Sequence, residues 1–158
     1  MKPRTLKVIG IDPTSRGFAY AFLEGSAHLV DWGLVHVLIR TDRSVFLRVE
    51  EIFSRTAPDL IVLEDGRGTK RRERARRLIK GIKRIAKRRK LPVRFVSRSR
   101  VREVFQPAST KQEIAEAIVR GFPELQSRLP RPRKPWTSED ERMSIFDALS
   151  FCIAALLE

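Results

Sequence analysis

Three acidic residues stand in strongly apolar stretches of the sequence, where a globular protein normally places none. Asp12 closes the strand-like run at 6–11, and Glu64 closes a second such run at 60–63. Asp147 lies inside the segment IFDAL, which opens the apolar C-terminal run. A carboxylate buried against apolar neighbours is strongly destabilising unless a partner or a metal ion compensates its charge. If these three side chains converge, they form a cation site.

Oxygen ligands of this kind suit magnesium. Mg²⁺ prefers carboxylate and water oxygens, and two such ions can clamp the attacking and leaving oxygens of a phosphodiester. No histidine or cysteine cluster offers a zinc alternative, because His28 and His36 fall in one strand-like region and Cys152 stands alone. The acids therefore favour phosphodiester chemistry with a hard divalent cation.

Each acid also has a simpler interpretation. Asp12 precedes a proline and could be a turn former. Glu64 could pair with the basic helix that follows it, and Asp147 could be an ordinary paired acid of a helix. Asp65 should point away from the face of Glu64 by strand alternation, so we leave it out of the site.

The elements that must position the acids follow from periodicity and turn signals. Alternating or continuously apolar runs predict strands at 6–12, 18–24, 28–37, 60–63 and 93–96. Helical spacing and capping signals predict helices at 42–56, 70–90, 98–105 and 111–119, a proline-rich loop at 122–137, and a last helix opened by a capping box at 138–141. This order predicts a mixed α/β layout with an antiparallel hairpin at its start, after a turn at 13–17. Asp12 and Glu64 then lie at C-terminal strand ends, where open α/β sheets place their ligand sites.

The positive charge is concentrated in one segment. The net charge is +14, and residues 67–90 contain 14 basic residues and a single acid, whereas the rest of the chain is nearly neutral. An apolar stripe through this segment indicates a helix rather than a disordered tail. A solvated face without a partner is the alternative, but dense like charge favours a polyanion, and nucleic acid is the polyanion that we expect. The residues we expect to contact it are Arg67, Lys70, Arg71, Arg72, Arg74, Arg76, Arg77 and Lys80.

The proline-rich loop is a second candidate contact surface. It contains Arg133, Lys134 and Trp136, among other basic residues. Trp136 could stack on a base, although an anchor for the loop is the commoner role of such a residue.

Composition sets the remaining limits. At 158 residues with 42% hydrophobic content, a single domain with a real core is expected. No run of about 18 uncharged apolar residues exists, so we predict no membrane span. The strand-like segment starting by residue 6 predicts no signal peptide. Cys152 is the only cysteine, which predicts a buried structural thiol and a reducing, cytoplasmic setting.

Three motifs together resemble a known family. The opening GIDPTSRGFAYAF, the strand IVLE and the late FDALSFCIA are similar to the RuvC-type Holliday junction resolvases of the ribonuclease H-like superfamily. The resemblance covers the chain in order and in length, and it implies a ribonuclease H-like mixed five-stranded sheet flanked by helices.

The resemblance also implies an activity. It suggests a homodimeric endonuclease that cuts four-way DNA junctions with Mg²⁺ or Mn²⁺, with two ions per site, held by Asp12, Glu64 and Asp147. Lys111, at the start of a helix capped by Thr110, matches the family segment that bears a lysine near the scissile phosphate. A solvated residue at a helix start is the alternative for Lys111.

Two departures from the family pattern concern the site. Ser144 stands where the family usually carries a fourth Asp or His, and Asp140, further upstream, could serve only through water or a second metal; as an ordinary acid of a first helical turn it would have no such role. After Glu64, Asp65-Gly66-Arg67-Gly68 replaces an aromatic wedge that some relatives present, which suggests a phosphate contact by Arg67.

The sequence therefore predicts a metal-dependent nuclease acting on branched DNA. Two rivals remain open. One is a related nuclease that processes RNA, and the other is a nucleic-acid-binding module of the same fold without catalysis.

Overall fold

The structure, a computed structural model, describes residues 4–38, 41–66 and 73–157. Its strands are β1 (Lys7–Thr14), β2 (Gly17–Glu24), β3 (His28–His36), β4 (Leu60–Glu64) and β5 (Val93–Val96). Its helices are α1 (Asp42–Thr56), α2 (Glu73–Arg88), α3 (Arg98–Phe105), α4 (Lys111–Gly121), the 3₁₀ helix η1 (Pro123–Arg128) and α5 (Met143–Leu156).

The strands form one mixed five-stranded sheet in the order β3-β2-β1-β4-β5. The first three strands pair antiparallel as a meander, whereas β1, β4 and β5 run parallel. The predicted α/β fold class is therefore confirmed. Because parallel strands point the same way, the carboxyl ends of β1, β4 and β5 meet at one edge of the sheet.

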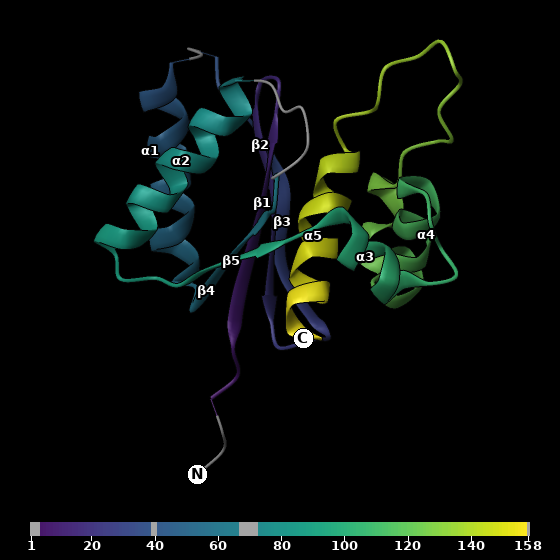
Figure 1. Cartoon of the computed structure of the whole chain (residues 1–158), viewed down its shortest axis with the longest axis horizontal. Coiled ribbons are helices and arrows are strands. Elements are labelled where there is room, and N and C mark those ends of the chain that lie inside the picture. The colour runs from purple at the N-terminus through teal and green to yellow at the C-terminus, as the bar shows by residue number, and fades with distance from the viewer. Residues whose placement is uncertain (1–3, 39–40, 67–72, 158) are drawn as a thin grey trace.

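Helices cover both faces of the sheet, as Figure 1 shows. Helices α1 and α2 pack on one face, over a core that includes Ile9, Ile11, Ile61 and Leu63. Helix α5 packs on the other face, with α3 and α4 outside it, over a core that includes Val8 and Val62. Alternate residues of β1 and β4 thus serve opposite cores, as the two-residue period of a strand requires.

Helix α5 crosses β1 at a residue without a side chain. A Cβ at Gly10 would lie 2.3 Å from the carbonyl oxygen of Ala148 and 2.7 Å from Sγ of Cys152. Only glycine allows this approach, which brings the middle of α5 against the middle of β1. Cys152 itself is fully buried, as predicted, and burial raises the pKa of its thiol.

Local signals explain most helix boundaries. The hydroxyl of Thr41 accepts a hydrogen bond from the Ser44 amide at the start of α1. Thr110 and Glu113 form a capping box at the start of α4. The apolar stripe predicted inside the basic segment is buried along α2; residues 70–72 of the predicted helix lie outside the described residues.

Three predicted boundaries were wrong. Strand β1 continues through Thr14 in register with β2, so the turn predicted at 13–17 is only the short link between these strands. The proline-rich segment is not all loop, because η1 forms within it. The predicted capping box at 138–141 does not open the last helix: α5 begins at Met143 with no side-chain cap, because the chain first makes tight turns closed by the carbonyls of Asp140 and Glu141.

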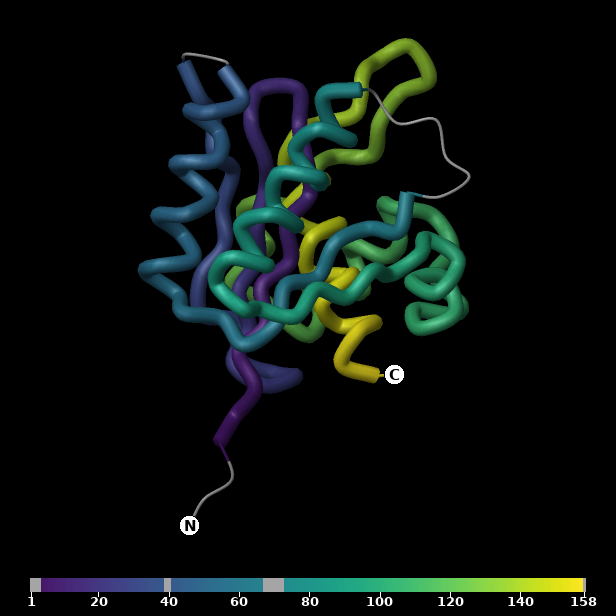
Figure 2. Tube along the Cα trace, turned by 60° about the vertical axis from the view of Figure 1, so that its left-hand side comes forward, coloured from purple at the N-terminus to yellow at the C-terminus, as the bar shows by residue number. Residues whose placement is uncertain are grey.

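The tip of the β1–β2 hairpin, the first turn of α2 and the segment 129–142 lie at the same end of the molecule (Figure 2). None of the described helices has the length and apolar character needed to cross a membrane.

Candidate active site

Asp12 and Glu64 come from neighbouring parallel strands. The register pairs Gly10 with Val62, and extending it by two residues sets Asp12 level with Glu64. Both residues continue the alternation that faces α5, since Val8 and Val62 belong to that core. Their side chains are nearly inaccessible, with 4% of Asp12 and 6% of Glu64 exposed.

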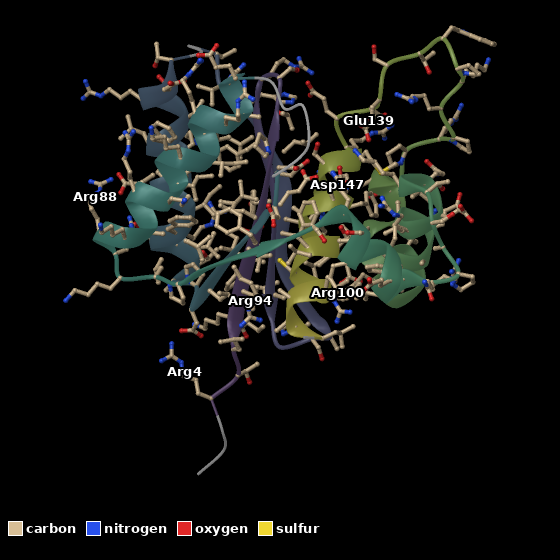
Figure 3. The ribbon with its side chains drawn as sticks, viewed as in Figure 1. Arg4, Arg88, Arg94, Arg100, Glu139 and Asp147 are labelled. Carbon is tan, nitrogen blue, oxygen red and sulfur yellow. The ribbon has the colours of Figure 1, made fainter. Side chains whose placement is uncertain are left out.

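Asp147 is the third buried acid, and it lies in the first half of α5, the end of the helix nearest the segment that carries Glu139 (Figure 3). Its exposed fraction is 5%. The close passage of α5 over Gly10 brings this part of the helix to the edge of the sheet where β1 and β4 end. We call Asp12, Glu64 and Asp147 the carboxylate cluster.

An arginine that sequence analysis did not single out joins two members of the cluster. Arg98 donates from Nε to Oε1 of Glu64 at 3.0 Å and from Nη1 to Oδ1 of Asp147 at 2.9 Å. Its guanidinium also lies 4.9 Å from the centre of the Phe151 ring. With 25% of its side chain exposed, Arg98 is a largely buried cation between two carboxylates.

Lys111 supplies a second cation. Its ammonium lies 3.3 Å from Oδ2 of Asp147 and 2.9 Å from Oε1 of Glu139. The two oxygens of Asp147 therefore each face a different cation. Lys111 therefore contacts one member of the carboxylate cluster while 42% of its side chain is exposed, and its role at a phosphate stays a prediction.

The balance of charge follows from these contacts. Burial acts to lower the pKa of Arg98, but attraction and hydrogen bonding from Asp147, with further attraction from Asp12 and Glu139, raise this pKa above its ordinary value. Arg98 therefore stays charged between the acids that it contacts.

The donor atoms of these residues suit a hard cation, but their present spacing does not. Three buried carboxylates at one sheet edge are the oxygen donors that Mg²⁺ or Mn²⁺ takes. Within residues 4–38, 41–66 and 73–157, however, no three Asp, Glu, His or Cys side chains are grouped closely enough to hold an ion. The guanidinium of Arg98 lies between Glu64 and Asp147 instead.

The other predicted metal ligand lies apart in its contacts. Asp140 is outside α5, and its carboxylate accepts from the backbone amide and the guanidinium of Arg142, at 2.9 and 2.7 Å. These hydrogen bonds lower the pKa of Asp140. The expectation that Asp140 stands on the same helix as Asp147 was wrong, and its role as a ligand stays a prediction. Ser144 lies half-buried one turn before Asp147.

The basic residues of α2 divide into two groups. Arg76 and Lys80 line a groove that reaches Glu64. Arg77 instead pairs with Asp42 of α1 at 3.1 Å, and Arg74 donates to the carbonyl oxygen of Ser15. The predicted contacts at Arg67, Lys70, Arg71 and Arg72 lie outside the described residues.

The segment 129–142 borders Lys111. Together with the start of α4 it lines a cavity of about 950 Å³ that includes Arg133, Lys134 and Trp136. Trp136 is 78% exposed, with the Lys134 ammonium 5.5 Å from its ring centre. Such exposure argues against the anchoring role, and it leaves the ring accessible for stacking.

Sequence analysis missed Arg98 and Glu139. A signal for Arg98 did exist, because it follows β5 just as Glu64 ends β4, with Ser97 capping the new helix. Recognising it required knowing that β5 lies beside β4. Glu139 gave no signal, since its contact with Lys111 joins residues 28 positions apart.

Comparisons with known proteins place this geometry in a class of folds. RuvC of Thermus thermophilus in complex with a Holliday junction substrate matches with a TM-score of 0.70 at 20% identity, over 96% of this chain and 93% of that one. A second Thermus thermophilus RuvC structure matches with a TM-score of 0.68 at 20% identity, covering 96% and 94% of the two chains. No family model and no curated protein sequence matches the chain.

A viral protein shares the same arrangement. The Fowlpox virus resolvase, solved in complex with substrate Holliday junction DNA, matches with a TM-score of 0.58 at 17% identity, over 97% of this chain and 100% of that one. The protein therefore has the RuvC-type ribonuclease H-like fold along nearly its whole described length, as the motifs predicted. At these identities the likeness establishes the fold, and function must be argued from the site.

Proposed function

We propose that this protein is a divalent-metal-dependent endonuclease that cuts four-way DNA junctions by hydrolysing phosphodiester bonds. The observation that carries the proposal is the burial of Asp12, Glu64 and Asp147 at the carboxyl edge of a RuvC-type sheet. Three buried acids at one edge lower the stability of the fold, so a purely structural role does not explain them. They are the oxygen donors that metal-dependent phosphodiester hydrolysis requires.

The carboxylate cluster would hold Mg²⁺ or Mn²⁺, which when bound supply Lewis acidity toward the phosphate and its attacking water. Two ions per site fit the number of carboxylate oxygens. Lys111, already at Asp147, would offset negative charge developing on the phosphate. Burial of the acids excludes bulk water and strengthens each of these interactions.

Arg98 must leave the cluster for that state to form. Its guanidinium is hydrogen-bonded to Oε1 of Glu64 and Oδ1 of Asp147. A metal ion shared by these two carboxylates could therefore bind only if Arg98 left its present position. Arg98 thus stabilises the metal-free protein by neutralising acids that would otherwise repel each other. A displaced Arg98 stays near the site, where a DNA phosphate is the available anion.

The substrate would lie across the end of the molecule that carries the hairpin tip, the first turn of α2 and the segment 129–142 (Figure 2). Groove-lining cations of α2 and the cations of 129–142 flank the carboxylate cluster from two sides. Two such surfaces suit a branched substrate, and the four-way junction is the substrate named for the structural neighbours. Symmetric cutting of two strands would require a homodimer, in which each subunit contributes one nuclease domain. We propose the cytoplasm as the location of this activity.

The test is cleavage of a synthetic four-way junction, duplex DNA and structured RNA, each with Mg²⁺ and with Mn²⁺. We expect the junction to be cut preferentially, and Asp12→Asn to lower the rate by about a thousandfold or more. Asp31→Asn is the matched control, because Asp31 pairs with Arg55 away from the cluster. Unchanged cleavage by Asp12→Asn would refute the assignment.

Two observations favour a second function. Arg98 within the cluster and Ser144 in place of a fourth ligand are what a binding module that has lost catalysis would carry. Junction binding with no cleavage in either metal would support that reading, whereas preferential cutting of RNA would identify an RNA-processing nuclease.

A further inference from the structure

A groove runs from the carboxyl end of β4 along the opposite face of the sheet from α5. Its volume is about 670 Å³, within the range of ligand-binding clefts. One wall is the α2 face formed by Arg76, Ile79, Lys80 and Lys83, the floor is Phe95 of β5, and one end is the segment 64–66. The groove therefore ends at Glu64, whose side chain points to the α5 side of the sheet and into the carboxylate cluster.

The floor is an exposed aromatic ring. Phe95 pairs with Leu63 in the parallel register, so the two side chains share the face covered by α2. Leu63 is fully buried, whereas Phe95 on the edge strand is 38% exposed. The ammonium of Lys83 lies 5.6 Å from the centre of its ring. The ring thus presents an apolar surface over which a cation lies.

The α2 wall of the groove carries a row of cations that differ in their contacts from the other basic residues of the helix. Arg77, Arg88 and Arg89 of α2 pair with acids of α1. Arg76, Lys80 and Lys83, one helical turn apart on the other side, form no ion pair with any carboxylate in the described part of the chain. The side of α2 that faces the groove is therefore the one available to an external anion.

We propose that this groove binds one unstacked nucleobase of the substrate strand, stacked on Phe95, with the flanking phosphates held by Arg76, Lys80 and Lys83. Base-aromatic stacking accepts any base, and neighbouring cations follow the backbone. Because the groove begins at Glu64, the base would lie close to the bond that the cluster acts on. The proposal rests on the proposed nuclease function, in that it names how the same site holds branched DNA.

The test uses the full-length protein in EDTA, so that binding is read without cleavage. The probe is a four-way junction carrying 5-iodouracil at positions around the branch point, which crosslinks under light to a stacked aromatic side chain. We expect the crosslink to map to Phe95. We also expect Phe95→Leu to weaken junction binding by about tenfold, in line with the loss of one stacked base, and Phe95→Trp to restore it. Leu47→Ala, an exposed apolar residue of α1, is the matched control.

Several results would overturn the proposal. These are a crosslink to Trp136 instead of Phe95, equal binding by wild type and Phe95→Leu, or conversion of a dimer to a monomer by Phe95→Leu in sedimentation, which would make a second protein copy the occupant. Thermal unfolding of Phe95→Leu verifies that the variant is folded. Because no metal is present, such a failure is separable from a failure of the nuclease assignment, which is read from Asp12→Asn cleavage.

Discussion

The chemistry of single residues centres on Arg98. Two of the three buried acids are joined through its guanidinium, and the third, Asp12, attracts it. Burying a carboxylate costs several kcal/mol unless its charge is compensated, and for Glu64 and Asp147 this arginine supplies part of the compensation. It therefore competes with any ion for the same oxygens.

Replacing Arg98 by Gln should destabilise the metal-free protein and improve metal binding. In EDTA we expect a loss of about 2 kcal/mol, or on the order of 5 °C in unfolding temperature, because Glu64 and Asp147 lose the guanidinium that joins them. Mn²⁺, titrated and followed by electron paramagnetic resonance of the free ion, should bind about tenfold more tightly.

Arg100→Gln is the control for that experiment, since Arg100 lies on the same helix but pairs with Glu103. Mn²⁺ affinity that falls or stays equal in Arg98→Gln would contradict the competition between arginine and metal.

The three acids could be predicted from the sequence because each interrupts an apolar run, and burial follows from the run itself. Arg98 could not, because a cation after a strand is ordinary until the neighbouring strand is known. Asp140 was misplaced for a related reason: the acidic stretch at 138–141 has the composition of a helix start, but tight turns before Met143 delay the helix.

Among the elements, the β1–β2 hairpin and the start of α5 are held together by one carboxylate. Glu141 accepts from the guanidinium of Arg16 and the hydroxyl of Ser15 at the hairpin tip, and contacts His36 at the end of β3. The hydrogen bond from Arg16 is the largest of the interactions that lower the pKa of Glu141 below its ordinary value. This contact fixes the strand that carries Asp12 relative to the helix that carries Asp147.

Glu141→Gln should therefore reduce stability in a pH-dependent way. A lowered pKa contributes stability above the ordinary pKa, and this contribution is lost as pH falls through the lowered value. We expect a loss of about 1 kcal/mol at pH 7, modest because the pair is partly exposed, and little difference between variant and wild type near pH 3. Urea unfolding at both pH values measures it; an equal difference at both would exclude an electrostatic origin.

Most elements follow from local patterns. The strands at the start of the chain alternate, α1 and α4 have their caps in the sequence, and the stripe within α2 is regular. The lengths of β1 and of the segment before α5 could not be predicted from local patterns, because they are set by pairing with β2 and by contacts with distant residues.

For the whole molecule, the decisive feature is how the positive charge is divided. One side of α2 is neutralised by α1, and the other faces the groove beside Glu64. The net charge of +14 pointed to a polyanion, but only the structure separates cations that stabilise the fold from those left for a partner.

A pair of triple variants tests this division. Replacing Arg76, Lys80 and Lys83 by Gln should weaken DNA binding and reduce the slope of log affinity against log salt by about 3, since each lost phosphate contact removes roughly 0.9. The same change at Arg77, Arg88 and Arg89 should leave the slope nearly unchanged and lower stability instead. Fluorescence anisotropy across a salt series distinguishes them, and equal slopes would contradict the division.

The most direct test of the account is the metal-dependent cleavage of a four-way DNA junction by wild-type protein and by Asp12→Asn, beside Asp31→Asn. We expect cleavage by the wild type and by Asp31→Asn in Mg²⁺ or Mn²⁺, and a rate lower by about a thousandfold in Asp12→Asn. Junction binding without cleavage by the wild type, or cleavage that survives Asp12→Asn, would contradict it.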